Sequence, residues 1–347
     1  MNVLWIDYLS HRGHINFNRI HLNALESLGN VSVDMVCRDI HADHYKHFCK
    51  KIVQVIPSSM YRRGPIAARI SYIFIQLFLW IKICFRKYDA VIFSSYDTTT
   101  FWLMPYLMNR HVFLIDHNNI GEIDRNKIKL MMMKLIQRNI THIVFNDYMK
   151  QFMISKGIKR VELIPHGIIS DVPHINNETN IIFCPSSTSS DKKFVKSLMC
   201  SDEFSDFLEK EQYVFYVKGS YKDILPKSNR IKIIATYLTN EEYRSLFLRS
   251  RIIILPYINS FRYRCSGVMF ECFAFRKYCL LPNTDNFKAY KQLFRYEPFF
   301  EKTIPSFLQI LSQLIKQEKD ISPKYNNLST QYPESYWRKL LAYRSNY

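Results

Sequence analysis

Glycine is scarce in this sequence, and the short signatures that most directly reveal a function are missing. Only 8 of 347 residues are glycine, which argues against fibrous or low-complexity character. The chain has 8 cysteines but no CxxC, and the spacing of Cys265, Cys272 and Cys279 crosses a helix into a strand. This geometry excludes a zinc ribbon, so we expect reduced, buried and inert thiols.

Long hydrophobic runs and leader signatures are also absent. The start MNVLWIDYL is typical of a buried strand and has no basic region or cleavage site, so we expect no signal peptide and a cytoplasmic chain. The most apolar stretch, residues 66–87, is interrupted by Gln76 and Lys82. It falls short of the roughly 20 apolar residues that a bilayer crossing needs.

Positive charge is in excess, with 48 Lys and Arg against 30 Asp and Glu, a net charge of +18. A polyphosphate ligand, an anionic membrane and nucleic acid are the candidate partners. Dispersed cations without a basic arm or an RNP-like aromatic signature argue against nucleic acid. Cations flank the 66–87 stretch: Arg62, Arg63, Arg69, Lys82, Arg86 and Lys87. We predict that residues 66–87 contact the anionic inner face of the plasma membrane, with a wholly buried helix as the alternative.

Short β-branched runs such as VLWID, AVIFS and HVFLID alternate with segments of helical spacing. This alternation predicts an α/β fold with parallel sheets. The polar stretch HGIISDVPHINNETN lacks periodicity and is the best linker. The sequence therefore predicts two doubly wound, Rossmann-like domains facing across a cleft, at residues 1–168 and 169–332. A last helix at 333–347 could cross back to the first domain.

Ligands of open parallel sheets bind at the carboxyl ends of the strands, and a cleft between two such sheets is the default site. In the first half, the polar residues at predicted strand ends are Gly13, His14, Asp116, His117, His166 and Gly167. In the second half they are Lys192, Lys193, Lys218 and Arg264, followed by a helix that starts at Ser266-Gly267. Cations around a helix amino terminus form an anion site, which suits a diphosphate.

Four segments of the second half follow one another in a recognisable order and spacing: VELIPHGI, IIFCPSSTSSDKKFVKSL, ILPYINSFRYRCSGVMFEC and KYCLLPN. In this order and spacing they resemble the carboxyl half of GT-B nucleotide-sugar glycosyltransferases, above all the family-four enzymes of bacterial surface polysaccharide synthesis. The resemblance implies that Lys193 or Lys192 contacts the donor phosphates and that Glu271 binds the donor ribose hydroxyls. It also implies that the diphosphate lies on the backbone amides of a helix start: Ser266, Gly267 and Val268.

This sequence departs from the E-x7-E pattern of that family, because Tyr263 stands where the first Glu is expected. The resemblance therefore leaves the stereochemical outcome open, and Arg264 could take over a phosphate or sugar contact. Ordinary loop packing is the alternative for both residues, and a buried ion pair with Arg264 is the alternative for Glu271. The resemblance also implies a cleft histidine near the acceptor at the position of His117, which would hydrogen-bond or transfer a proton. We therefore predict His117 as the catalytic base, with Asp116 as a substitute and a hydrogen-bonded loop histidine without a catalytic role as the alternative.

The resemblance implies a glycosyltransferase that moves a hexose-type sugar from a nucleotide-diphosphate sugar to a saccharide acceptor, expected to be linked to polyprenyl diphosphate. The product would be a surface polysaccharide such as O-antigen or capsule. No Asp-x-Asp pair occurs, so we expect no divalent metal and no other cofactor. Two alternatives remain: a nucleotide-sugar 2-epimerase, which needs several acids and bases where the strand ends offer few carboxylates, and a non-enzymatic basic binder of nucleic acid or membrane.

Overall fold

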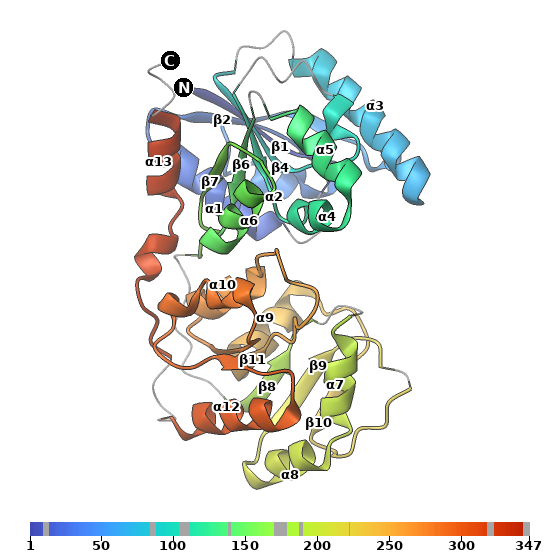
Figure 1. The fold of residues 1–347 in the computed structure, drawn as a ribbon, viewed down its shortest axis with the longest axis vertical. Helices are drawn as coiled ribbons and strands as arrows, with labels where there is room; N and C mark the ends of the chain where they lie inside the picture. The colour runs from blue at the N-terminus through green and yellow to red at the C-terminus, as the bar shows by residue number, and fades with distance from the viewer. Residues whose placement is uncertain are drawn as a thin grey trace. The chain divides into compact units, whose positions relative to one another are not determined.

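The computed structural model contains two α/β units, each built on its own parallel sheet (Figure 1). Unit 1 consists of Met1–Gly167, Tyr263–Cys265 and Ser329–Tyr347, and unit 2 of Ile168–Arg262 and Ser266–Leu328. The α/β fold class with two doubly wound parallel sheets is therefore confirmed. The structure describes residues 1–9, 14–83, 88–103, 111–137, 140–169, 179–186, 190–221, 223–317 and 323–342.

Unit 1 has a seven-stranded sheet in the order β3-β2-β1-β4-β5-β6-β7. The strands in the middle of the sheet are almost fully buried, as expected for a parallel sheet that is covered on both faces, whereas the two edge strands are partly exposed. Their bounds are β1 (Asn2–Asp7), β2 (Ser32–Arg38), β3 (Lys51–Ile56), β4 (Ala90–Ser95), β5 (Val112–Ile115), β6 (Ile140–Val144) and β7 (Val161–Leu163). The strand order changes direction between β1 and β4, which is where sheets of this kind bind ligands.

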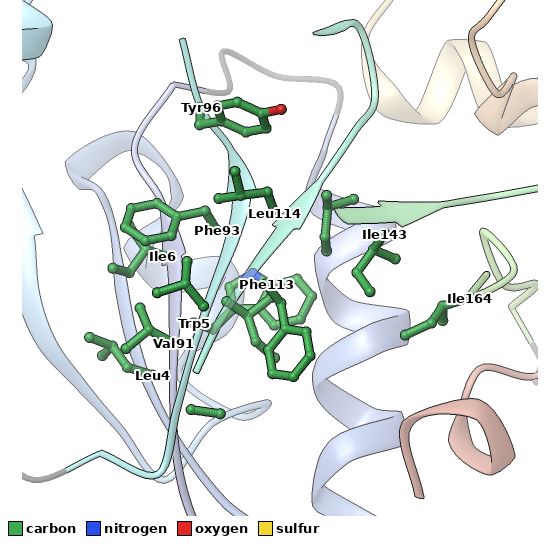
Figure 2. Packing of buried hydrophobic residues seen from close by; sticks show 14 of the residues in the cluster. Leu4, Trp5, Ile6, Val91, Phe93, Tyr96, Phe113, Leu114, Ile143 and Ile164 are labelled. Atoms are coloured by element: carbon green, nitrogen blue, oxygen red, sulfur yellow. The ribbon is translucent and has the colours of Figure 1, made fainter. Parts of the chain in front are cut away.

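The helices of unit 1 cover this sheet and close its core. They are α1 (Ile15–Glu26), α2 (Ala42–Tyr45), α3 (Pro65–Ile83), α4 (Asn119–Arg125), α5 (Lys127–Leu135), α6 (Asp147–Ser155) and α13 (Glu334–Ala342), with the short 3-10 turns η1 (Asp39–His41), η2 (Ser58–Met60), η3 (Phe101–Leu103) and η6 (Leu328–Gln331). Figure 2 shows Trp5, Phe93 and Phe113 within the buried cluster. The last helix contributes Trp337, whose ring lies 6.3 Å from Trp5 and 6.1 Å from Phe113.

Unit 2 has a six-stranded sheet in the order β10-β9-β8-β11-β12-β13. Its strands are β8 (Thr179–Cys184), β9 (Val214–Lys218), β10 (Ile231–Ile234), β11 (Ser250–Ile254), β12 (Tyr278–Pro282) and β13 (Phe299–Phe300). Its helices are α7 (Lys192–Met199), α8 (Asp202–Lys210), α9 (Asn240–Arg249), α10 (Gly267–Ala274), α11 (Asp285–Lys288) and α12 (Ile304–Lys316), with the turn η5 (Lys291–Leu293). Here the strand order changes direction between β8 and β11.

The apolar stretch at 66–87 forms α3 over Pro65–Ile83, and residues 84–87 lie outside the described residues. Proline at the first helical position suits the start of a helix, because its missing N–H has no partner to lose there. One side of α3 is buried through Ile75 and Leu79. No helix in the part of the chain that the structure describes is both long and apolar enough to cross a membrane.

Candidate functional site

In unit 2, polar groups gather at the carboxyl ends of β8 and β11, where the strand order changes direction. Ser186 follows β8, and its hydroxyl lies 2.5 Å from the hydroxyl of Tyr257, which follows β11. Asp191 is buried before α7 and accepts hydrogen bonds from the Asn259 backbone amide at 2.9 Å and from the Ser260 hydroxyl. These bonds hold the loop that leads from β11 towards α10.

Helix α10 begins after this loop. The Ser266 side chain is its N-cap and accepts a hydrogen bond from the Met269 backbone N–H at 3.3 Å. Gly267 follows as the first helical residue and is exposed, and Val268 is half-buried. A small exposed residue at this point lets an anion approach the amino end of the helix, where the helix dipole favours negative charge.

Glu271 lies in the next turn of α10 and is half-buried. Its Oε2 atom accepts a hydrogen bond of 2.9 Å from the hydroxyl of Tyr243 on α9. Burial, reinforced by the Glu271 carboxylate, raises the pKa of Tyr243 well above its ordinary value, so the phenol remains a donor at neutral pH. Glu271 is thus held in a defined orientation by a neighbouring helix. Its predicted role at a ribose remains a prediction.

Three lysines predicted to contact phosphates lie at the same edge of the unit 2 sheet. Lys192 and Lys193 are the first residues of α7, which follows β8, and Lys218 is the last residue of β9. The Lys192 amino group lies 3.5 Å from a backbone carbonyl oxygen, that of Ser220. Lys193 is exposed, which makes it the better placed of the two α7 lysines to meet a ligand.

In unit 1, two predicted histidines come together from the loops after β1 and β5. The rings of His14 and His117 lie 4.3 Å apart, and Phe17 packs 4.3 Å from His117. Burial lowers the pKa of both histidines, and neighbouring imidazoles lower that of His117 further. Within the described ranges, His14 Nδ1 and His117 Nε2 are buried without a hydrogen-bond partner. A neutral imidazole with an unpaired nitrogen can accept a proton, which suits the predicted base His117.

His166 belongs to a structural chain of hydrogen bonds. The Trp337 indole N–H donates to His21 Nδ1 at 3.0 Å, which leaves the protonated His21 Nε2 facing the His166 carbonyl oxygen at 3.2 Å. Gly167 follows with φ +87°, and a Cβ atom there would clash with a methyl group of Ile20. The Pro-His-Gly turn after β7 therefore contacts α1 and connects to α13 through His21.

Asp116 is fully buried at the end of β5. One carboxylate oxygen accepts a hydrogen bond from the Tyr96 hydroxyl, and the other lies 2.9 Å from His142 Nδ1. Burial, with a further contribution from Asp116, raises the pKa of Tyr96 well above its ordinary value. Both oxygens are thus engaged inside the protein. This arrangement favours His117 over Asp116 as the proton acceptor.

A further carboxylate was missed in the sequence. Glu122 on α4 accepts a hydrogen bond from the Thr98 hydroxyl at 2.9 Å, and the Lys129 amino group lies 2.9 Å from the same oxygen. Glu122 also acts electrostatically on Arg264. Burial lowers the pKa of the Arg264 guanidinium and the positive charge of Arg125 lowers it further, whereas the negative charge of Glu122 raises it. The hydroxyl run in FSSYDTTT, placed directly after an apolar strand, was the signal that could have pointed to this group.

The remaining predicted residues fall in different places. Gly13 lies outside the described residues. Arg264 belongs to unit 1 with Tyr263, although we expected it beside the unit 2 lysines. Tyr263 is buried and stacks on Phe152 of α6 at 4.1 Å, so the packing alternative describes its position. A cavity of about 450 Å³ lies at the opposite, amino-terminal edge of the unit 1 sheet, away from all of these groups.

No family model and no curated protein matches this chain. Solved structures match it along nearly its whole length. UDP-GlcNAc 2-epimerase from Methanocaldococcus jannaschii aligns over 99% of this chain and 100% of its own, with a TM-score of 0.64 and 12% identity. Anabaena HepE in complex with UDP-glucose aligns over 100% and 99%, with a TM-score of 0.65 and 11% identity. A glycosyltransferase from Rickettsia africae aligns over 99% and 93%, with a TM-score of 0.58 and 12% identity. At these identities the likeness establishes a GT-B-like fold.

The predicted glycosyltransferase activity, with its saccharide acceptor and its place in polysaccharide synthesis, needs correction. Further matches are again UDP-GlcNAc 2-epimerases, among them the Neisseria meningitidis structure bound to UDP-GlcNAc. The comparison therefore favours the epimerase alternative. The structure also shows a carboxylate that the argument against this alternative did not count: Glu122 on α4, which Thr98 beyond β4 contacts.

Proposed function

We propose that this chain is an enzyme that inverts C2 of a sugar linked to uridine diphosphate, with a 2-acetamido hexose as the substrate class. The observation that carries the proposal is Glu271 on α10, which Tyr243 of α9 holds in place and which follows an exposed helix amino end that favours an anion. The fold is matched along its length by UDP-GlcNAc 2-epimerases. The resemblance to the family-four enzymes supports only the part of the proposal that says how the nucleotide is held. Glu271 binds the ribose hydroxyls, and the α10 amides and Lys193 bind the diphosphate.

The chemistry of C2 dictates what else the enzyme must supply. The hydrogen on C2 of a pyranoside has no neighbouring carbonyl group, so simple removal and return of a proton is too difficult. Instead, uridine diphosphate leaves C1 while C2 loses its proton, and a double bond forms between C1 and C2. Return of a proton to the other face of C2, with renewed attack of the diphosphate on C1, gives the inverted sugar. No atom is gained or lost overall.

This route needs a base, an acid and a means of stabilising the leaving diphosphate. The neutral His117, with its unpaired Nε2, serves as the base, and Glu122 is the available partner for returning a proton. Lys193 and the α10 amides stabilise the charge that develops on the diphosphate. Cations and amides meet this need without a divalent ion, so we propose that none is required. The predicted contact of residues 66–87 with a membrane is independent of this chemistry.

The test is incubation with UDP-GlcNAc in deuterated water and no acceptor, followed by NMR. We expect the manno epimer to appear with deuterium at C2, because His117 keeps the proton that it removes and Glu122 returns one that has exchanged with the solvent. The His117→Asn variant should bind UDP normally and lose exchange, whereas Glu271→Gln should weaken UDP binding about tenfold or more. The proposed reaction is wrong if the wild type binds UDP but shows neither deuterium exchange at C2 nor an epimer with any UDP-linked 2-acetamido hexose.

A further inference from the structure

The exposed apolar side chains of this protein are concentrated on one part of unit 1. Of the 17 large hydrophobic residues exposed in the described chain, 10 lie on α3, η3 and α5. Single exposed hydrophobic residues are ordinary, but a cluster indicates an interaction surface. We define the α3–α5 face by the six that carry the argument: Ile70, Phe74, Leu77, Trp102, Ile128 and Leu135. Their exposed fractions run from 40% to 65%.

The spacing of these residues gives each helix two apolar sides. On α3, Ile70, Phe74 and Leu77 recur every three to four residues, while Ile75 and Leu79 are fully buried on the other side. On α5, Ile128 and Leu135 are exposed two turns apart, while Met133 is buried. A helix that only covers a sheet presents polar residues to water. Both helices therefore carry more apolar surface than the fold of unit 1 uses.

The turn η3 connects the two helices into one face. It contacts both α3 and α5, and its Trp102 is exposed. Figure 1 shows α3 in light blue and α5 in green on the same flank of unit 1. Trp102 thus lies where an aromatic ring can bridge apolar and polar surroundings, the position that tryptophan favours at a membrane interface.

Charge decides which partner fits the face. The sequence has no Asp or Glu from residue 44 to 88, nor from 125 to 146. Exposed cations border the apolar residues: Arg62, Arg63 and Arg69 beside α3, and Lys127 and Lys134 on α5. A second copy of this chain would bring the same cations against one another, which disfavours a symmetric dimer through this face. An anionic lipid surface complements both the charge and the apolar side chains.

We propose that the α3–α5 face binds the headgroup layer of an anionic bilayer, with α3 and α5 both lying in the plane of the membrane. Phe74, Leu77, Ile128 and Leu135 enter the boundary between headgroups and acyl chains, and the bordering arginines and lysines bind lipid phosphates. This site is larger than the single stretch predicted from the sequence, since η3 and α5 contribute half of it. Binding depends on both apolar area and charge, so it weakens as salt screens the lipid phosphates.

Vesicle sedimentation with the full chain tests the proposal. We expect binding to phosphatidylcholine vesicles that contain phosphatidylglycerol to be at least about tenfold tighter than to phosphatidylcholine alone, and to weaken with added salt. The double variant Phe74→Glu, Ile128→Glu should lose binding at an unchanged melting temperature. Leu225→Glu is the matched control, because Leu225 is 89% exposed on unit 2. It should bind as the wild type does.

A second measurement separates this surface from a protein interface. Sedimentation velocity without lipid should give the same mass for the wild type and the double variant. If the wild type instead sediments as a dimer that the double variant dissociates, the face is an interface between copies and the proposal is overturned. Equal binding to neutral and anionic vesicles, binding to neither, or loss of binding in Leu225→Glu would overturn it as well.

Discussion

Acidification should destabilise unit 1 through histidines that its fold keeps neutral. Burial lowers the pKa of His21 to about 3, and its hydrogen bonds fix the neutral tautomer: Trp337 donates to Nδ1, and Nε2 donates to the His166 carbonyl. Burial likewise lowers the pKa of His166 to about 4. In an unfolded chain both imidazoles would titrate near pH 6.5. Between about pH 4 and pH 6.5 the unfolded state therefore binds more protons than the folded state.

The sign and size of the effect follow from this difference. Because the unfolded state takes up protons as the pH falls below 6.5, the free energy of unfolding falls with it, by about 1.4 kcal/mol per pH unit and histidine. From pH 7 to pH 5, His21 and His166 each remove about 2 kcal/mol, together about 4 kcal/mol. That is a large share of the 5–15 kcal/mol that typically stabilises a domain. His14 and His117 act in the same direction, since burial lowers the pKa of each.

Urea unfolding followed by tryptophan fluorescence measures this effect in unit 1. All 4 tryptophans, Trp5, Trp80, Trp102 and Trp337, belong to unit 1, so their emission does not follow unit 2 directly. His21→Gln is the matched variant, because an amide can accept from the Trp337 N–H and donate to the His166 carbonyl without titrating. Between pH 7 and pH 5 it should lose about 2 kcal/mol less than the wild type. An equal loss in both proteins would refute the assignment of this pH dependence to His21.

Three further predictions concern the nucleotide site, the backbone and the metal requirement. Glu271→Gln should weaken UDP binding, measured by calorimetry, about tenfold or more, because a charged hydrogen-bond acceptor is lost. Tyr243→Phe should weaken UDP binding less. An unchanged affinity for UDP in both variants would contradict the proposed nucleotide site. Gly167→Ala should destabilise unit 1 by about 2 kcal/mol, since a left-handed φ is strained by a Cβ that also meets Ile20. Gly29→Ala, with φ +74° but open space, should cost less in the same urea assay. EDTA should leave epimerisation unchanged, and restoration of lost activity by a divalent ion would show a metal requirement.

The fold was predictable because its signal is local and repeated. A strand such as HVFLI must be buried on both faces, and a segment such as NFNRIHLNALES has a helical period, so their alternation implies parallel sheets. The start of α10 was predictable for a similar reason. Ser266 and Gly267 are typical helix-start residues, and their neighbour Glu271 is an acid in an apolar segment.

The network around Glu122 could not be predicted in the same way. Thr98 and Lys129 meet Glu122 from segments 24 residues before and 7 residues after it, and no sequence spacing specifies that meeting. The burial of His142 against Asp116 was hidden for a different reason, because a histidine inside an apolar strand gives no indication of what lies on the neighbouring strand. Register sets that partner: Leu114, two residues before Asp116, pairs with His142.

The residue at position 263 links the fold to the proposed function. Tyr263 is buried, stacks on Phe152 at 4.1 Å and lies 5.5 Å from the ring of Tyr148. A glutamate at this position would place a carboxylate against two aromatic rings in the unit 1 core, where an unpaired charge costs several kcal/mol. The E-x7-E pattern of the family-four enzymes is therefore incompatible with the packing that this chain adopts. Position 263 therefore supplies no carboxylate in this chain, and under the proposed function the chemistry at the sugar depends on His117 and on Glu122 of α4.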